Sequence, residues 1–424
     1  MSADLRPGYK QTEVGVIPEA WDVKPLSRSA EIRGGIAKNS NVVASDPIAV
    51  HYLRVANVQD GFLDLAEMST IELSRYDLAR YTVFPGDVLM NEGGDLDKLG
   101  RSAIWRGEVS PCVHQNHVFV VRCKAALLPD YLNAWTATSS ARRFFLLTGK
   151  QTTNLASISK SSLGGLPVAV PPLPEQRAIA EALSDVDALL GALDRLIAKK
   201  RDLKQGAMQQ LLAGQTRLPG FHGEWARLNM ADDSTLKARI GWQGLTTAEY
   251  LETGEYFLVT GTDFSDGCIA WSSCCFVAAL RYTQDRNIQL QSKDILLTKD
   301  GTIGKVAFVD HLPGPATLNS GVFVIRPKHG TYDPQFFYYV LTSRIFDEFL
   351  ARLQAGSTIS HLYQKDFVSF SFLAPATVSE QAAIAEVLSD MDAELASLGQ
   401  RRDKTHALKQ AMMQELLTGR TRLV

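Results

Sequence analysis

The stretch Glu175-Gln-Arg-Ala-Ile-Ala-Glu-Ala-Leu-Ser-Asp-Val-Asp187 occurs twice in this chain of 424 residues. It returns as Glu380-Gln-Ala-Ala-Ile-Ala-Glu-Val-Leu-Ser-Asp-Met-Asp392, with 10 of 13 positions identical. A second pair, Leu203–Leu218 and Leu408–Leu423, is identical at 11 of 16 positions, and the offset is 205 residues for both pairs. The sequence between the two pairs has diverged while its length has not. A repeat of this kind is typical of a spacer, in which distance matters more than side-chain identity.

Apolar residues recur at alternating steps of four and three in both copies. This pattern predicts two long helices whose apolar stripes pack on a partner helix as a coiled coil, rather than two unrelated surface helices. About 36 helical residues would form a rod of roughly 54 Å, and Gly214 and Gly419 stand where each helix should end. The predicted seam consists of Ile179, Leu183, Val186, Leu190, Leu193 and Ile197 in the first copy and Ile384, Leu388, Met391, Leu395 and Leu398 in the second.

The composition restricts the class of protein. The chain has 44 basic and 46 acidic residues and a net charge of −2, which disfavours purely electrostatic DNA binding but not local, sequence-specific readout. Five cysteines show no Cys-x-x-Cys pair, so we expect buried thiols in a reducing compartment. The first ten residues lack an apolar core, and no apolar run approaches 18 residues. We therefore expect a cytoplasmic protein with no membrane span.

Both halves of the chain open with a related segment. Thr12–Trp21 is echoed by Thr216–Trp225, again about one repeat length apart, so the repeating unit is a globular domain followed by a helix. The predicted organisation is a first domain at 1–170, a central spacer helix at 171–215, a second domain at 216–375 and a C-terminal spacer helix at 376–424.

The two globular parts share short matching segments. Gly86–Met90 corresponds to Lys293–Leu297, and His117–Arg122 corresponds to Gly321–Arg326; each reads as a short strand. Pro129 and Pro334 each open a predicted helix at its first turn. Short strands with a few helices, not in strict alternation, predict an α+β fold. Two domains with one scaffold and different loops are suited to bind two similar but distinct targets.

Catalytic motifs are missing from the sequence. Gly301–Lys305 resembles a phosphate-binding loop, but Lys299 stands where that loop needs a glycine and Val306 where it needs Ser or Thr. There is no His-Glu-x-x-His, no Gly-x-Ser-x-Gly and no Asn/Asp-Pro-Pro-aromatic tetrad of an amino-methyltransferase. His114 and His117 have a spacing that a metal pair could use, but no cysteine or carboxylate cluster accompanies them. A solvated or base-contacting loop is favoured there, so we expect a chain without catalysis and without a metal.

The repeated segments resemble one known family. Pro171-Pro-Leu-Pro-Glu-Gln-Arg-Ala-Ile-Ala180, its near copy from Glu380, Lys204-Gln-Gly-Ala-Met-Gln-Gln-Leu-Leu-Ala-Gly214 and the strand at Gly86 are similar to the specificity subunit of type I restriction–modification enzymes. The resemblance covers the whole chain. The second copy departs from the pattern, because Ala374-Pro-Ala-Thr-Val-Ser379 replaces the Pro-Pro-Leu-Pro run and leaves the start of the second helix open.

The resemblance implies two target-recognition domains with pseudo-twofold symmetry, separated by two long helices packed as an antiparallel coiled coil. Each domain would read one half of an asymmetric, split site in double-stranded DNA. The implied partners are two modification subunits, which hold S-adenosylmethionine and methylate adenine, and two restriction subunits, which use ATP and Mg²⁺ and cut DNA. No cofactor is expected in this chain itself. The alternative is a coiled-coil scaffold that joins two protein partners without reading DNA; a methyltransferase fused to a reader would need the missing tetrad.

Base readout needs polar or basic side chains on loops that can enter a groove. The loops after Met90, Ser110, Gly149, Leu297, Pro315 and Gly356, each taken as a set, are better candidates for base readout than any single residue in them. The basic residues 195–204 either form a solvated helix face or contact phosphates across the spacer. Candidate DNA-binding residues in the first domain are Arg33, Lys38, Lys98, Arg101, Gln115, Asn116, Lys150, Gln151, Thr152 and Asn154, and in the second Arg239, Gln243, Lys299, Thr302, Lys305, Asn319, Ser320, Ser357, Thr358 and His361.

Overall fold

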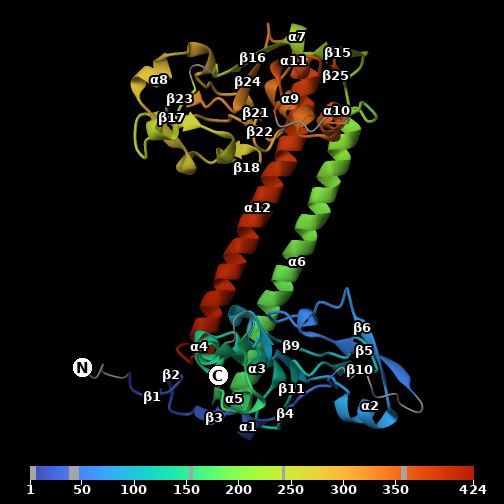
Figure 1. The fold of residues 1–424 in the computed structure, drawn as a ribbon, viewed down its shortest axis with the longest axis vertical. Coiled ribbons are helices and arrows are strands. Elements are labelled where there is room, and N and C mark those ends of the chain that lie inside the picture. The colour runs from blue at the N-terminus through green and yellow to red at the C-terminus, as the bar shows by residue number, and fades with distance from the viewer. Residues whose placement is uncertain (1–5, 38–46, 152–155, 241–243, 355–360) are drawn as a thin grey trace. The chain divides into compact units, whose positions relative to one another are not determined.

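The computed structural model describes residues 6–37, 47–151, 156–240, 244–354 and 361–424. It divides into two compact units, of which unit 1 comprises Met1–Asp194 with Gln400–Val424 and unit 2 comprises Arg195–Gly399. Each unit contains one globular domain and about half of each long helix (Figure 1). No helix within the described ranges is both long enough and apolar enough to cross a membrane.

The two long helices predicted from the repeat are confirmed. Helix α6 spans Leu173–Leu212 (40 residues) and helix α12 spans Val378–Leu416 (39 residues), and both run without a break in Figure 1. Gly214 and Gly419 follow the helix ends with φ values of 67° and 69°. This left-handed conformation is the one that glycine adopts at a helix C-terminus.

In unit 1 the first half of α6 packs antiparallel against the last part of α12. Ion pairs join Asp187 to Lys409 at 2.6 Å and Glu175 to Arg422. Residues earlier in α6 therefore pair with residues later in the chain, which shows that the two helices are antiparallel. Apolar residues of both helices lie in one core with the globular domain, among them Ile179, Leu183, Met413, Leu416 and Leu417.

Unit 2 repeats this arrangement with the roles of the helices exchanged. Lys204 pairs with Asp392 and Arg217 with Glu380, at the positions that match Lys409–Asp187 and Arg422–Glu175 in the repeat. Lys200 also pairs with Glu394 at 2.7 Å, so two of the basic residues in the spacer bind acidic side chains of α12. The helical part of this core includes Leu211, Leu212, Ile384, Ala385 and Leu388.

The predicted seam residues differ in how far they are buried. Those nearest the domains, together with two in the middle of α6, are almost completely inaccessible to solvent. The buried members are Ile179, Leu183, Leu193, Ile197, Ile384 and Leu388, and the half-buried members are Val186, Leu190, Met391, Leu395 and Leu398.

The repeated Glu-Gln dipeptide attaches each long helix to its domain. Glu175 accepts from Arg422 and from Trp21 Nε1 at 2.9 Å, and the next residue, Gln176, donates to Pro171 O and accepts from Leu128 N. Glu380 and Gln381 make the matching bonds in unit 2 with Arg217, Pro375 O and Asp333 N. The dipeptide therefore recurs because both side chains are buried and hydrogen-bonded at each helix start.

The domain of unit 1 is built on a four-stranded antiparallel sheet with the order β4-β11-β7-β9 and a three-stranded sheet with the order β10-β5-β6. The pair β10–β5 is parallel. The strands are β1 Tyr9–Thr12, β2 Gly15–Pro18, β3 Asp22–Pro25, β4 Ala30–Arg33, β5 Ile48–Leu53, β6 Ser69–Leu73, β7 Val88–Asn91, β8 Gly93–Gly94, β9 Ser102–Ile104, β10 Cys112–His114, β11 Val118–Cys123, β12 Lys150–Gln151, β13 Ala156–Ser157 and β14 Pro167–Val170; the helices are α1 Leu26–Ser29, α2 Arg75–Tyr81, α3 Pro129–Thr136, α4 Ser139–Thr148 and α5 Lys160–Gly164.

The domain of unit 2 has sheets with the orders β16-β24-β21-β22 and β20-β17-β23, and β17–β23 is again parallel. The strands are β15 Trp225–Asn229, β16 Ser234–Ala238, β17 Tyr256–Val259, β18 Phe264–Ser265, β19 Cys268–Ile269, β20 Cys275–Val277, β21 Ile295–Thr298, β22 Val306–Phe308, β23 Ala316–Leu318, β24 Val322–Pro327 and β25 Ser371–Pro375; the helices are α7 Met230–Asp233, α8 Ala279–Thr283, α9 Pro334–Leu341, α10 Arg344–Gln354 and α11 Gln364–Phe367.

The two domains therefore share one α+β topology, as predicted. Strand by strand, β4, β11, β7 and β9 correspond to β16, β24, β21 and β22, and the parallel pair β10–β5 corresponds to β23–β17. Helices α3 and α9 both begin with the expected proline. Among the described residues, the β1–β2 hairpin occurs only in unit 1. The β8–β13 pairing of unit 1 is matched in unit 2 by the single bridge Asp300–His361, and the β18–β19 hairpin of unit 2 is matched in unit 1 by the single bridge Val58–Leu63.

Candidate nucleic-acid interface

In unit 1 several strand ends meet at one edge of the domain. The ends of β4, β5, β7 and β10 and the start of β11 lie there, which follows from the register of these strands. We call residues 34–36, 54–57, 91–94, 115–117, 150–151 and 156–158 the first loop edge. Its backbone is held by four hydrogen bonds of 2.8–2.9 Å: Gln115 N to Leu53 O, Asn116 N to Ile36 O, Glu92 N to His117 O, and Ile158 N to Glu92 O.

Unit 2 builds the same edge. We call residues 239–240, 260–263, 298–305, 319–321 and 361–363 the second loop edge. Three backbone bonds of 2.8–2.9 Å match three of those in unit 1: Asn319 N to Val259 O, Lys299 N to Gly321 O, and Leu362 N to Lys299 O. The two edges are thus one scaffold that carries different side chains.

At the first loop edge, the turn between β10 and β11 carries Gln115 and Asn116. Both are partly exposed, and Asn116 Nδ2 lies 3.4 Å from His117 Nε2. Lys150 and Gln151 are exposed on β12, in the sheet that β12 forms with β13 and β8. The structure therefore brings these four predicted residues to a single edge, where their donors and acceptors are available to a ligand.

Three other candidates of unit 1 are paired with neighbouring acceptors. Arg33 binds both carboxylate oxygens of Glu31, at 2.8 and 3.0 Å, and this contact lowers the pKa of Glu31. Lys98 pairs with Asp95. Arg101 lies 3.2 Å from Gln59 Oε1 and 3.4 Å from an oxygen of Asp60. Because exposed ion pairs contribute little to stability, a phosphate could replace Glu31 at Arg33 or Asp95 at Lys98 at small cost.

The second loop edge has its own set of polar contacts. Asn319 Nδ2 donates to Tyr250 Oη at 2.6 Å, and Asn319 Oδ1 accepts from Ser320 N at 2.7 Å. Lys299 is only 14 % exposed; its Nζ lies 3.7 Å from Asp300 and 5.6 Å from the centre of the Phe323 ring. Thr302 and Lys305 are exposed, and His361 Nδ1 is in hydrogen-bond contact with a carboxylate oxygen of Asp300.

Arg239 differs from the other candidates because its side chain points into the domain. It is 2 % exposed, and it donates from Nε to Leu318 O at 2.8 Å and from Nη2 to Thr317 Oγ1 at 3.2 Å. Burial lowers the pKa of Arg239. The guanidinium would have to leave these acceptors before it could reach a DNA groove. In this position Arg239 binds the end of β23 underneath the second loop edge.

Six candidates lie outside the described residues: Lys38, Thr152, Asn154, Gln243, Ser357 and Thr358.

Several residues of the loop edges were not among the candidates from the sequence. Tyr363 is 55 % exposed, its ring lies 4.5 Å from the ring of His361, and Lys365 Nζ lies 5.5 Å from the Tyr363 ring centre. Exposed aromatic rings can stack on bases. Glu92 and Asp300 bring carboxylates, which accept from the amino group of cytosine. A search limited to basic, amide and hydroxyl side chains does not select these residues. Tyr363 could have been found from the sequence because it is an aromatic residue only two positions after His361, the end of the polar segment 356–361.

The two histidines considered for a metal lie in different surroundings. His114 is buried, and its Nδ1 lies 2.6 Å from Val118 O. Burial lowers the pKa of His114 to about 4, so the ring is neutral near pH 7. His117 is exposed and lies 3.2 Å from Glu92. In the parts of the chain that the structure describes, no three His, Cys, Asp or Glu residues are grouped so that they could hold a metal ion.

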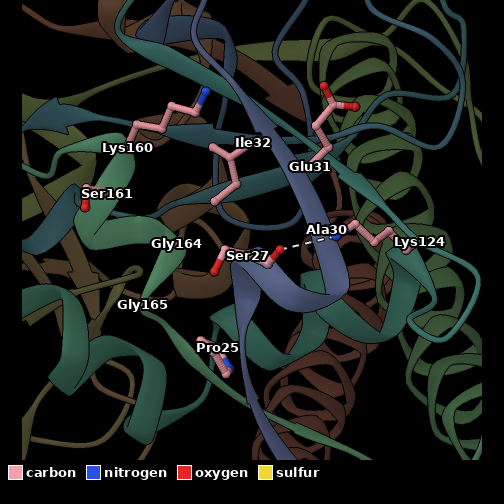
Figure 2. Close-up of a pocket in the computed structure, with 10 residues that line it drawn as sticks. All are labelled: Pro25, Ser27, Ala30, Glu31, Ile32, Lys124, Lys160, Ser161, Gly164 and Gly165. Atoms are coloured by element: carbon pink, nitrogen blue, oxygen red, sulfur yellow. Dashed lines mark hydrogen bonds between the residues drawn. The ribbon is translucent and has the colours of Figure 1, made fainter.

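A surface pocket of about 970 Å³ lies at the opposite end of the β4–β11 pair from the first loop edge (Figure 2). Lys124 Nζ donates to Ser27 O at 3.3 Å across one side of it. None of the DNA-binding candidates lines this pocket, so it is separate from the loop edge. Its lining residues are Pro25, Ser27, Ala30, Glu31, Ile32, Lys124, Lys160, Ser161, Gly164 and Gly165.

Two matched loop edges on duplicated domains define a class of protein with paired recognition modules, and sequence comparison identifies the family. The chain matches the Type I restriction modification DNA specificity domain over residues 18–199 and again over residues 245–404. It therefore belongs to the family of type I restriction specificity subunits. Members of this family are generally not catalytic.

Individual relatives cover the chain to different extents. It is 25 % identical to the putative type I restriction enzyme MjaX specificity subunit of Methanocaldococcus jannaschii, over 98 % of this chain and 97 % of that protein. It is 23 % identical to the type I restriction enzyme EcoKI specificity subunit of Escherichia coli K12, over 44 % of this chain and 40 % of that protein. The similarity to the first relative extends over both domains and both helices.

Solved structures show the same fold. The S subunit of a type I restriction–modification system from M. genitalium superposes with a TM-score of 0.59 at 14 % identity, over 98 % of both chains. A chain from a study of complex assembly in a type I system gives a TM-score of 0.57 at 14 % identity, over 95 % of this chain and 99 % of that one.

Proposed function

We propose that this chain reads a bipartite, asymmetric site in double-stranded DNA, with one domain for each half-site. One observation carries the proposal: the two loop edges share three backbone hydrogen bonds but carry different side chains at corresponding positions. Gln115 and Asn116 in unit 1 correspond to Asn319 and Ser320 in unit 2, and Glu92 corresponds to Lys299. Because amide, hydroxyl and charged groups prefer different base edges, such edges would read different sequences.

The proposal includes the partners that would act on the site once it is read. Two modification subunits would hold S-adenosylmethionine and methylate adenine at N6, and two restriction subunits would use ATP and Mg²⁺ to cleave. Membership of the family supports a place in such a complex. This chain would then supply specificity and bind none of these cofactors.

The long helices would set the length of the unread spacer between the half-sites. A helix of 40 residues is about 60 Å long at 1.5 Å per residue. The ion pairs of Asp187 with Lys409 and of Lys204 with Asp392 fix the register of the two helices. A fixed register prevents sliding, which a spacer of constant length requires.

The test is to reconstitute the chain with its modification subunits and to sequence the methylated positions. The double variant Gln115→Ala/Asn116→Ala should change base preference in one half-site only, and Asn319→Ala/Ser320→Ala should change it in the other only. A gel shift with random duplex competitor measures whether the assembly has any sequence preference. Loss of preference in the wild-type assembly would favour the scaffold alternative and refute the proposal.

A further inference from the structure

We propose that Gly35 and Arg239 are positioning residues that support the base-reading loops of the two domains by different means. The inference rests on the proposed function. Neither residue would touch DNA; each would set the orientation of the residues that do. It assigns to Arg239 a role other than the base contact expected from its residue type.

Gly35 and Arg239 occupy the same place in the two domains. In unit 1, Arg33 pairs with Val120, which pairs with Leu89. In unit 2, Lys237 pairs with Val324, which pairs with Leu296. Leu89 and Leu296 are the third residues of the matching segments Asp87–Met90 and Asp294–Leu297. Gly35 and Arg239 each come two residues after the paired position, at the point where β4 or β16 has ended.

Both residues lie beside the same backbone carbonyl, which Arg239 binds directly and which Ile36, next to Gly35, binds in unit 1. His114 pairs with Leu53 on β5, and Leu318 pairs with Val259 on β17, so His114 and Leu318 are equivalent ends of β10 and β23. Each is followed directly by a predicted reader, Gln115 or Asn319. The carbonyl of His114 or Leu318 is therefore the last strand position before the turn that carries Gln115 and Asn116 in unit 1 or Asn319 and Ser320 in unit 2.

In unit 1 the support is made by the backbone alone. Ile36 N donates to His114 O at 2.9 Å. A Cβ atom at Gly35 would lie 2.2 Å from Gln115 O and 2.3 Å from His114 O, far below any real contact distance. Only glycine allows the two backbones to approach in this way.

In unit 2 a side chain takes over this task. Arg239 Nε donates to Leu318 O at 2.8 Å, and Nη2 donates to Thr317 Oγ1 at 3.2 Å. Nη1 is buried and has no hydrogen-bond partner among the described residues. An arginine that is buried without a bonded carboxylate is unfavourable for stability, so its presence here needs an explanation other than stability. Holding the Asn319–Ser320 turn in place is such an explanation.

The experiment uses the full chain with its modification subunits and measures base preference separately for each half-site, together with Tm. Arg239→Met should reduce discrimination at the half-site read by unit 2 by about tenfold, the scale of one lost base contact, and leave the other half-site unchanged. Arg239→Lys, which can still donate to Leu318 O, should restore part of it. Gly35→Ala should produce the reciprocal effect at the half-site of unit 1.

The controls separate the possible failures. If Asn319→Ala/Ser320→Ala changes no base preference, the proposed function itself is wrong. If that variant changes the preference but Arg239→Met and Arg239→Lys do not, or if they weaken both half-sites equally, Arg239 has no positioning role. Should Arg239→Met not fold, Arg239→Lys decides, because it keeps a donor for Leu318 O but loses the second bond, to Thr317 Oγ1. Discrimination below wild type at the half-site of unit 2 is then expected, and wild-type discrimination at 25 °C would overturn the positioning role.

Discussion

His114 shows how a single residue can make the stability of the first domain depend on pH. It lies at the end of β10, directly before Gln115, and its ring is enclosed by the domain. The imidazole is hydrogen-bonded to Val118 O, and burial disfavours its protonated form more than this bond favours it. Its pKa of about 4 is well below the ordinary value of 6.5.

We predict that unit 1 loses stability as the pH falls from about 6.5 to 4. In this window the unfolded chain binds a proton at His114 and the folded chain does not, so acid favours unfolding. The full effect is about 3 kcal/mol, from a shift of roughly 2.5 pKa units. Urea unfolding at pH 7 and pH 5 measures the part that is lost by pH 5, about 2 kcal/mol. His114→Asn, which keeps a donor for Val118 O, should reduce the slope, whereas His117→Asn at the exposed neighbour should not. An unchanged slope in His114→Asn would contradict the argument.

The candidate DNA-binding residues show which features of the site the sequence could not predict. Polarity and loop position selected Gln115, Asn116 and Asn319, and the structure brings each to a loop edge. The same criteria selected Arg239, whose direction depends on the acceptors Leu318 O and Thr317 Oγ1 on a distant strand. Residue type says which bonds a side chain can make but not which way it points. A buried side chain that supports a loop therefore cannot be distinguished from an exposed one that could contact a base before the fold is known.

At the scale of the element, the long helices were predictable because their signal is local. The four-three spacing of apolar residues, the glycine after each end and the repeat itself all lie within single segments. The sheets were less accessible, because the parallel pair β5–β10 joins residues about 60 positions apart and the strands are short. The repeat helped here, since one strand identified in both domains, such as β11 and β24, is more certain than either alone.

Glycines in and after the helices should respond in opposite ways to alanine. Gly206 lies inside α6 and Gly399 inside α12, and an added Cβ at either would meet no described atom within 4 Å. Each Gly→Ala change should therefore raise the free energy of unfolding by up to about 1 kcal/mol. Gly419→Ala should lower it, because φ is 69° and the new Cβ would lie 2.4 Å from Pro18 Cδ.

Thermal and urea unfolding of the three variants measures these effects side by side. A loss of stability in Gly206→Ala and Gly399→Ala would mean that the glycines serve close packing against something other than the described chain. Equal stability of Gly419→Ala and wild type would show that the turn after α12 can rearrange freely.

At the scale of the whole molecule, the duplication gives one chain two matching loop edges, one for each proposed half-site. Each unit takes its helical support from both repeats, since Glu175 binds Arg422 in unit 1 and Glu380 binds Arg217 in unit 2. Neither globular domain forms its compact unit with sequence from one half alone. A change in one helix therefore has to be matched in the other if both units are to keep their contacts.

This requirement allows the proposed spacer to be tested by a matched deletion. In unit 1, Asp187 pairs with Lys409 and Asp194 lies 3.9 Å from Arg402, so residues 188–194 run opposite residues 402–408. Removing both heptads keeps the register of the remaining ion pairs and shortens each helix by about 10 Å. The expected product recognises the same two half-sites with a spacer shorter by about three base pairs, at 3.4 Å each. Sequencing of methylated positions measures the spacing.

Removal of 188–194 alone is the control: it breaks the register, so we expect a lower Tm and no defined new spacing. If the matched deletion folds and methylates sites with the original spacer, the helices do not set that distance.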